Sequence, residues 1–218
     1  AEQNADLDDS MKSRISLVKF ASDSTDDIGN DLYEEYWSNP RWQNRSQVVS
    51  DFTTSFDGLK NTVNQLDPAG ATRADYGMQH AARVLNGEGS LTGARENAEK
   101  IVIFFTDGSP SSSSEWDSDV ANSAISHAKG IKDTGATIYS VGIFEGADAD
   151  ESIDSAWGND ENRFMHAVSS NYPDATSYRD IGQRAVNSEF YFAADDAEQL
   201  NKVFEDIFDQ IQTEAQYP

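Results

Sequence analysis

The segment Lys100–Pro110, KIVIFFTDGSP, restricts the fold of this chain more than any other stretch. Five consecutive apolar residues run directly into Thr106, Asp107 and Gly108. A short run without polar alternation is typical of a strand that is buried on both faces, in the middle of a parallel sheet. Asp107 stands where this strand ends, and open α/β sheets bind ligands at the carboxyl ends of their strands. The sequence therefore predicts an α/β protein in which Asp107 is a candidate ligand-binding residue.

The rest of the chain alternates between strand and helix patterns. Apolar runs predict further strands at 13–21, 136–144 and 189–194, and apolar periodicity predicts helices at 51–66, 73–85, 119–134, 164–169 and from Asp195 onward. The last helix has an apolar stripe that must pack against the sheet: Leu200, Val203, Phe204, Ile207, Phe208 and Ile211. Glycine is expected to end two helices, at Gly87 and Gly135, and Asp195 with Glu198 predicts a capping box at the start of the last one.

This alternation predicts a doubly wound α/β fold, with a mainly parallel sheet flanked by helices. No low-complexity linker divides the chain, so residues 1–218 are interpreted as one domain. Two long loops interrupt it, an aromatic-rich loop at 22–50 and an acidic loop at 146–162.

Each loop admits more than one interpretation. The aromatic residues of the first loop either pack it onto the body of the protein or form an exposed patch that grips a protein or glycan: Tyr33, Tyr36, Trp37 and Trp42. The second loop lacks the glycine and the terminal glutamate of an EF-hand, so a solvated insertion is favoured over a calcium site. Its acidic residues are Asp148, Asp150, Glu151, Asp154, Asp160 and Glu161.

The charge of the chain excludes several partners. Sixteen basic residues against thirty-nine acidic ones leave a formal charge of -23, which repels nucleic acid and anionic membranes. The absence of cysteine excludes disulfides and thiolate metal sites. No run is apolar enough to insert into a membrane, and the first ten residues lack the pattern of a secretory signal.

Catalytic histidine chemistry is not predicted. His80 and His127 lie within predicted helices, and His166 lies beside a helical stretch. None stands near a serine in the Gly-x-Ser-x-Gly pattern of a nucleophile elbow, which the chain lacks. We therefore expect each to be a surface or core histidine, and no enzyme activity.

Three segments carry a resemblance to a known family: the loop Pro68-Ala69-Gly70-Ala71-Thr72 ahead of a helix, the apolar strand followed by Thr106-Asp107-Gly108, and the later strand Tyr139-Ser140-Val141-Gly142-Ile143. In their order and spacing they resemble the von Willebrand factor A family over essentially the whole chain. The segments SRISLVKFAS, GATRADYGMQHA and FMHAVSSNYPDA, with the aromatic loop, are similar to the A domains of pilus-tip adhesins and wall-anchored surface proteins of Gram-positive bacteria. The resemblance implies a Rossmann-like fold.

It also implies a metal-ion-dependent adhesion site, built from three motifs at the carboxyl ends of strands. Thr72 matches the second motif of the family and Asp107 the third. Their oxygen donors suit Mg²⁺, with Mn²⁺ and Ca²⁺ as alternatives. The implied partner is a protein of the host surface or extracellular matrix, and the implied location is the bacterial cell surface, as one domain of a larger surface protein.

The first motif, Asp-x-Ser-x-Ser after the first strand, has no counterpart near the N-terminus. The nearest imitation, Asp8-Asp9-Ser10-Met11-Lys12, has lysine in place of the second serine and no apolar strand before it. We expect an N-terminally truncated domain that lacks its first strand, so that Mg²⁺ binding depends on an earlier segment or another chain that supplies the motif. Loss of a central strand would expose backbone groups of its two neighbours.

Alternatives remain open at this stage. Asp107 could instead cap the turn after its strand, and Thr72 could be a helix N-cap. A structural or assembly module with a non-functional metal site is the main alternative to an adhesion module. A Mg²⁺-dependent phosphohydrolase that uses Asp107 is disfavoured by the acidic surface, and an intracellular A domain of a metal-chelatase complex by the pilus-like segments.

Overall fold

The computed structural model describes residues 7–35, 41–151, 153, 158–186 and 188–216. The chain divides into two compact units, Ala1–Glu96 and Asn97–Pro218, each of which is described by itself. The interpretation of residues 1–218 as one domain stays a prediction.

The first unit contains two antiparallel strand pairs and two helices. Its elements are β1 (Ile15–Lys19), β2 (Leu32–Glu35), β3 (Arg41–Asn44), β4 (Gln47–Thr53), α1 (Phe56–Val63) and α2 (Ala74–Asn86). β1 pairs with β4, and β2 pairs with β3. The prediction of an irregular loop at 22–50 is therefore wrong, and so is the helix start at Asp51, which lies in β4. Phe52 and Phe56 suggested one helix because their spacing is helical, but the strand ends between them.

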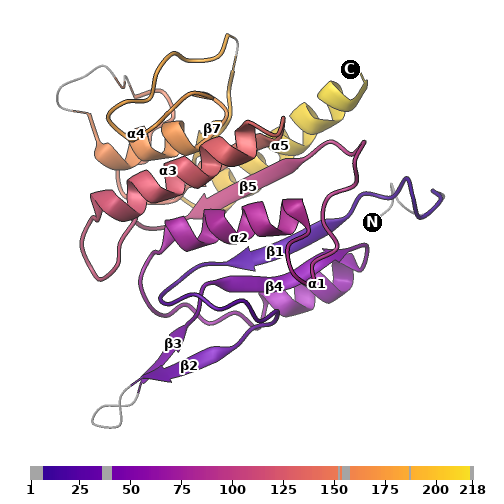
Figure 1. Ribbon diagram of the computed structural model, residues 1–218. Coiled ribbons are helices and arrows are strands. Elements are labelled where there is room, and N and C mark those ends of the chain that lie inside the picture. Colours follow the sequence, from indigo (N-terminus) through magenta and orange to yellow (C-terminus); the bar gives the residue numbers. More distant parts are fainter. Residues whose placement is uncertain (1–6, 36–40, 152, 154–157, 187, 217–218) are drawn as a thin grey trace. The chain divides into compact units, whose positions relative to one another are not determined.

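Helix α2 packs on the β1–β4 pair and forms the core of this unit (Figure 1). Its Val84 lies in a cluster with Val48 of β4 and with Leu91. A Cβ at Gly77 would lie 2.8 Å from the ring of Phe20, so the helix approaches the end of β1 closely because this position is glycine. The helix ends as predicted, with Gly87 in the left-handed conformation (φ 67°).

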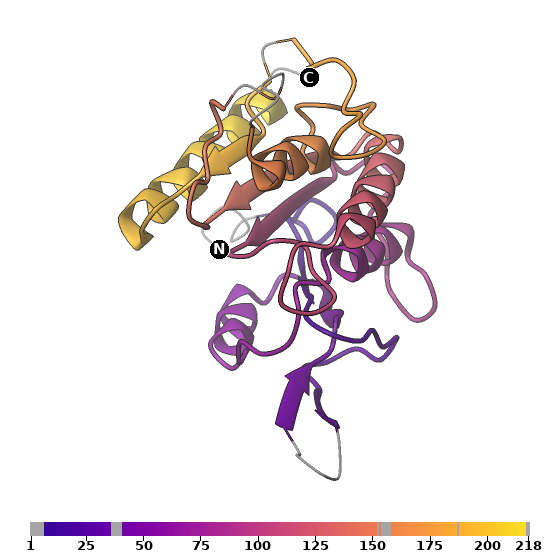
Figure 2. The ribbon, with the colours of Figure 1, turned by 90° about the vertical axis from the view of Figure 1, so that its left-hand side faces the viewer.

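The second unit is built on a parallel three-stranded sheet in the order β5-β6-β7. Its elements are β5 (Ile101–Thr106), α3 (Ser118–Lys132), β6 (Thr137–Gly142), α4 (Asp160–Val168), β7 (Tyr191–Ala193) and α5 (Ala197–Gln216). Figure 2 shows α3 and α5 on opposite sides of this sheet. The predicted α/β class, with a parallel sheet flanked by helices, is confirmed. The antiparallel pairs of the first unit were not anticipated.

Strand β6 contacts helices on both of its faces. Tyr139 and Val141 form a cluster with Val203 and Ile207 of α5, while the hydroxyl of Ser140 donates to the carbonyl of Met165 on α4 at 2.9 Å. The predicted stripe of α5 is only partly buried, since Phe204 is 41% and Phe208 49% exposed.

Two predicted helix ends differ from the structure. The N-cap of α5 is Asp196, whose carboxylate accepts from the amides of Glu198 and Gln199, both at 2.9 Å, so the capping box predicted at Asp195 is wrong. Helix α3 ends at Lys132 with Asp133 as its C-cap, and Gly135 follows in the turn with φ 81°. Within the described part of the chain, no helix has the length and apolar character that a membrane span requires.

Candidate functional site

Thr72 lies in the segment that leads into α2. Backbone amides of this segment donate hydrogen bonds that hold it in place. The amide of Arg73 donates to the carbonyl of Ala21 at 3.0 Å, at the end of β1. The amide of Ala71 donates to the hydroxyl of Ser22 at 3.2 Å. The N-cap position of α2 is Arg73, so the alternative interpretation of Thr72 as the N-cap residue is wrong. Thr72 is half-buried, one residue ahead of that position.

Gly70 brings this segment against the end of β1. Its φ of 101° is in the region that favours glycine, and a Cβ at this position would lie 2.4 Å from the hydroxyl of Ser22. The side-chain amide of Asn44 also donates to the carbonyl of Asp67. The chain ahead of Thr72 therefore follows a path that a larger residue at position 70 would disturb.

Asp107 occupies a tight turn directly after β5, and its carboxylate is exposed. The side chain of Thr106 closes this turn, since its hydroxyl donates to the carbonyl of Gly108 at 2.9 Å and accepts from the amide of Gly108 at 3.2 Å. Among the described residues, no partner donates a hydrogen bond to the carboxylate of Asp107. Thr106, not Asp107, caps the turn, so the turn-cap interpretation of Asp107 is wrong.

The serines that follow Asp107 are bonded within the second unit. The hydroxyl of Ser109 donates to the carboxylate of Glu161 at 2.6 Å, and the buried Ser111 donates to the carbonyl of Ser113 at 3.4 Å. These serines are not among the site residues that the sequence predicts. Asp107, Ser109 and Ser111 do have the spacing Asp-x-Ser-x-Ser, which could have drawn attention to Ser109.

The two predicted metal ligands belong to different units, Thr72 to the first and Asp107 to the second. The hypothesis that they share one ion therefore rests on the sequence pattern. Within either unit, the described residues contain no group of three or more histidine, aspartate or glutamate side chains arranged to hold a metal ion. Any protein-held ion at Asp107 would depend mainly on oxygen donors from hydroxyls, water and a partner.

The described parts of the acidic loop make several side-chain hydrogen bonds. The side-chain amide of Asn162 donates to the carbonyl of Gly146 at 2.9 Å and to the carboxylate of Glu151, and the hydroxyl of Tyr191 donates to Asn162 at 2.6 Å. Burial raises the pKa of Tyr191, so it remains a donor. Helix α4 begins at Asp160, inside the predicted loop. Asp154 lies outside the described residues.

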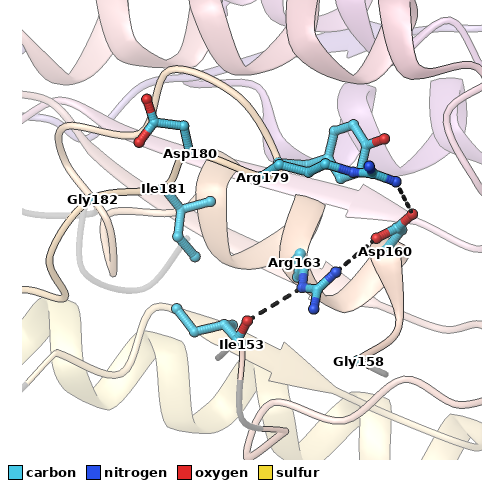
Figure 3. Close-up of a pocket in the computed structure, with 9 residues that line it drawn as sticks. Ile153, Gly158, Asp160, Arg163, Arg179, Asp180, Ile181 and Gly182 are labelled. Carbon is cyan, nitrogen blue, oxygen red and sulfur yellow. Dashed lines mark hydrogen bonds and ion pairs between the residues drawn. The ribbon is translucent and has the colours of Figure 1, made fainter. Parts of the chain in front are cut away.

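A hollow of about 680 Å³ lies beside the first turn of α4 (Figure 3). It is lined by Ile153, Gly158, Asp160, Arg163, Tyr178, Arg179, Asp180, Ile181 and Gly182. Asp160 pairs there with Arg163 at 3.0 Å and with Arg179 at 3.6 Å. Because two guanidinium groups neutralise Asp160, this carboxylate is a poor cation ligand.

A serine and a histidine meet in the first unit, a pair that sequence reasoning missed because they lie 56 residues apart. The hydroxyl of Ser24 is 2.9 Å from Nε2 of His80, and Nδ1 of His80 is 3.0 Å from the guanidinium of Arg83. Arginine can only donate, so Nδ1 accepts and Nε2 carries the proton. Nε2 therefore donates to Ser24 or to the carbonyl of Ser46 at 3.0 Å. It cannot take a proton from Ser24, which argues against a serine nucleophile.

The other two histidines lie on helices of the second unit. His166 is buried on α4, where Nδ1 lies 3.1 Å from the side-chain amide of Asn171. Burial, with a smaller contribution from the charge of Arg184, lowers the pKa of His166 to about 4. His127 is half-buried on α3.

The aromatic loop contains the hairpin formed by β2 and β3, which carry Tyr33 and Trp42. Tyr36 and Trp37 lie outside the described residues. Both interpretations of these aromatic residues, as packing or as a binding patch, stay predictions.

Comparison with known proteins identifies one family and a similar solved structure. The family model described as von Willebrand factor type A domain matches residues 3–206. The chain is similar to the pilus adhesin SpaC from Lactobacillus rhamnosus GG, at 17% sequence identity and a TM-score of 0.51. The match covers 91% of this chain and 25% of the adhesin, so the chain spans about a quarter of that protein's length. No curated protein matches the chain.

Proposed function

The chain belongs to the von Willebrand factor type A domain family, and on this basis we propose that it is a metal-ion-dependent adhesion module of a bacterial surface or pilus protein. Its partner is a protein ligand of the host surface or extracellular matrix, and it acts as one domain of a larger surface protein. Nucleic acid and direct membrane insertion play no part in this function.

The carboxylate of Asp107 is the observation that carries the proposal. It is exposed at the end of a strand of the parallel sheet, where α/β folds bind ligands. The turn is closed by Thr106, so the position does not require aspartate for the fold. An unbonded carboxylate at such a place is available to a cation.

The donors proposed for the ion are a hydroxyl and a carboxylate, both of which suit Mg²⁺, a hard cation that prefers oxygen and keeps several waters. Mn²⁺ and Ca²⁺ are the alternatives. Thr72 offers a neutral oxygen, and Asp107 supplies negative charge through a water. When bound, the ion supplies a positive centre that is short of negative protein ligands, so it retains affinity for an acidic side chain of the partner.

The proposed metal site also requires the serine ligands of the family's first motif. No Asp-x-Ser-x-Ser pattern precedes Thr72 in these 218 residues. Tight binding of Mg²⁺ therefore depends on a segment that supplies those serines, and Thr72 with Asp107 alone bind the ion weakly.

A structural or assembly module with a non-functional metal site is the second candidate. The same missing motif favours it. Catalysis is not proposed, because the Ser24–His80 pair has the wrong proton arrangement for a nucleophile and the net charge of -23 opposes phosphate substrates.

The proposal is tested by adhesion of protein-coated beads to a panel of immobilised extracellular matrix proteins, in Mg²⁺ and then in EDTA. Adhesion that EDTA abolishes, and that Asp107→Ala removes, supports the adhesion module. Asp150→Ala is the matched control, because Asp150 is also an exposed carboxylate. Adhesion that survives both EDTA and Asp107→Ala contradicts the metal-dependent function and favours the second candidate.

A further inference from the structure

The position of Asp107 is determined by its neighbours, because no described residue bonds to its carboxylate. On one side, Thr106 closes the turn through its two hydrogen bonds with Gly108. On the other side, Ser109 is tied to Glu161 of α4 at 2.6 Å. Hydrogen bonds of Thr106 and of Ser109 therefore hold the chain on both sides of Asp107, and the bond of Ser109 reaches α4.

Glu161 is a firm anchor because the first turn of α4 is itself held in place. The side chain of Asn159 caps the helix and accepts from the amide of Glu161 at 2.7 Å. One residue later, the buried Asn162 bonds to Gly146 and receives the hydroxyl of Tyr191. These bonds connect α4 to β7 and to the acidic loop, so Glu161 cannot move without disturbing them.

Packing fixes α4 against the strand that carries the turn. The ring of Phe164 meets the ring of Phe104 on β5 edge to face, with centroids 5.9 Å apart. Phe164 is buried, and the neighbouring Met165 accepts the hydroxyl of Ser140. The Ser109–Glu161 bond thus links the turn after β5 to the first turn of α4, which packs against β5.

We propose that Ser109 and Glu161 are positioning residues for Asp107, which set the affinity of the site for a divalent cation by holding the turn in its binding conformation. This inference rests on the proposed function of Asp107. In metal sites, the groups that orient a ligand typically change metal affinity by about 10–100-fold when they are removed. Glu161 acts through its hydrogen bond to Ser109, not as a ligand and not through its charge.

The hydrogen bond and the charge of Glu161 can be separated by substitution. Glu161→Gln keeps an oxygen that accepts from Ser109 but removes the negative charge. Glu161→Ala removes both, and Ser109→Ala removes the bond but keeps the charge. A positioning role predicts that Ser109→Ala and Glu161→Ala have the same effect, that the double variant is no worse than either, and that Glu161→Gln stays close to the unaltered protein.

The test measures two quantities on the full chain, with Mn²⁺ alone as the probe. Hydrogen exchange of the amides at 106–109 without metal reports the order of the turn. Titration with Mn²⁺, followed by the broadening of the Gly108 amide resonance, gives the dissociation constant. Ser114→Ala and Glu115→Ala are matched controls, because both residues are exposed in the same loop.

We expect Ser109→Ala and Glu161→Ala to speed exchange of the turn and to raise the Mn²⁺ dissociation constant about 10-fold or more, whereas Glu161→Gln changes it less than about 3-fold. Equal losses in Glu161→Gln and Glu161→Ala overturn the positioning role, and so does unchanged exchange in Ser109→Ala. If Asp107→Ala leaves Mn²⁺ binding unchanged, the proposed function fails. Hydrogen exchange still decides whether the Ser109–Glu161 bond orders the turn.

Discussion

The segment that carries Thr72 is held by its backbone, whereas the turn that carries Asp107 is held by side chains. Ahead of α2, the amide of Arg73 donates to the carbonyl of Ala21 and the amide of Ala71 to the hydroxyl of Ser22, both just after β1, and a Cβ at Gly70 would lie 2.4 Å from that hydroxyl. After β5, the turn depends on the hydroxyls of Thr106 and Ser109. The segments of these two candidate ligands thus differ in how firmly each is held within its own unit.

This difference predicts how easily each segment opens in the folded protein. A segment held by backbone bonds against a core opens rarely, while a turn held by partly exposed side-chain bonds opens at lower free energy. An ion at Asp107 would therefore order its turn, whereas the Thr72 segment is already held within its own unit. The following predictions test that contrast, in order of decreasing effect.

Lowering the pH is expected to have the largest effect. It should reduce the free energy of unfolding through His166 on α4, the helix that supports the Asp107 turn. Burial lowers the pKa of His166 on α4 to about 4, against about 6.5 in an unfolded chain. Between these values the unfolded state binds a proton that the folded state does not, so the free energy of unfolding falls as the pH falls from 6.5 to 4. The loss attributable to this group approaches about 3 kcal/mol.

The measurement is chemical denaturation between pH 7 and 4, compared with the variant His166→Gln, which has no titrating group at this position. The difference in slope between the two proteins isolates His166 from the many carboxylates. Parallel pH profiles would show that α4 is not the acid-sensitive support of the turn.

Gly70→Ala is expected to destabilise the first unit by about 2–3 kcal/mol, since it adds both backbone strain and a clash. The new Cβ would lie 2.4 Å from the hydroxyl of Ser22. Gly89→Ala is the matched control, because Gly89 also has a positive φ (66°) but no heavy atom within 4 Å of the new Cβ. It should lose only about 1 kcal/mol. Equal losses in thermal denaturation would mean that the contact with Ser22 does not hold the Thr72 segment.

Ser22→Ala is expected to have the smallest effect, about 1 kcal/mol, because it removes the hydrogen bond from the amide of Ala71 to the Ser22 hydroxyl. The backbone bond from Arg73 to Ala21 remains, so hydrogen exchange at 70–73 should change little. Ser109→Ala should loosen its own turn far more. If the two serine variants loosen their segments equally, the contrast between backbone and side-chain support is wrong.

Local patterns predicted the parallel sheet well. The apolar runs identify β5 and β6, because strands buried in a sheet require apolar residues. The glycine identifies the end of α2, because its left-handed conformation favours glycine. The start of α1 was misjudged because Phe52 and Phe56 match helical spacing while Phe52 belongs to β4. The stripe on α5 includes Phe208, which is largely exposed, since periodicity shows a face but not what covers it.

The candidate site was predictable only where it follows a sequence pattern. Asp107 and Thr72 stand at positions that a family motif indicates. The bond between Ser109 and Glu161 joins residues 52 positions apart, and the contact of Ser24 with His80 spans 56. Neither leaves a local signal, because tertiary packing alone brings these side chains together.

The most direct test of the central claim is whether one ion contacts both segments. Mn²⁺ added to the chain in moderate salt should broaden the amide resonances of Thr72 and Gly108 over the same concentration range, and excess Mg²⁺ should reverse both. Asp107→Ala should abolish both effects, while the control Asp150→Ala should not. Broadening that is confined to the acidic loop, or that reaches Gly108 without Thr72, would contradict a shared metal site.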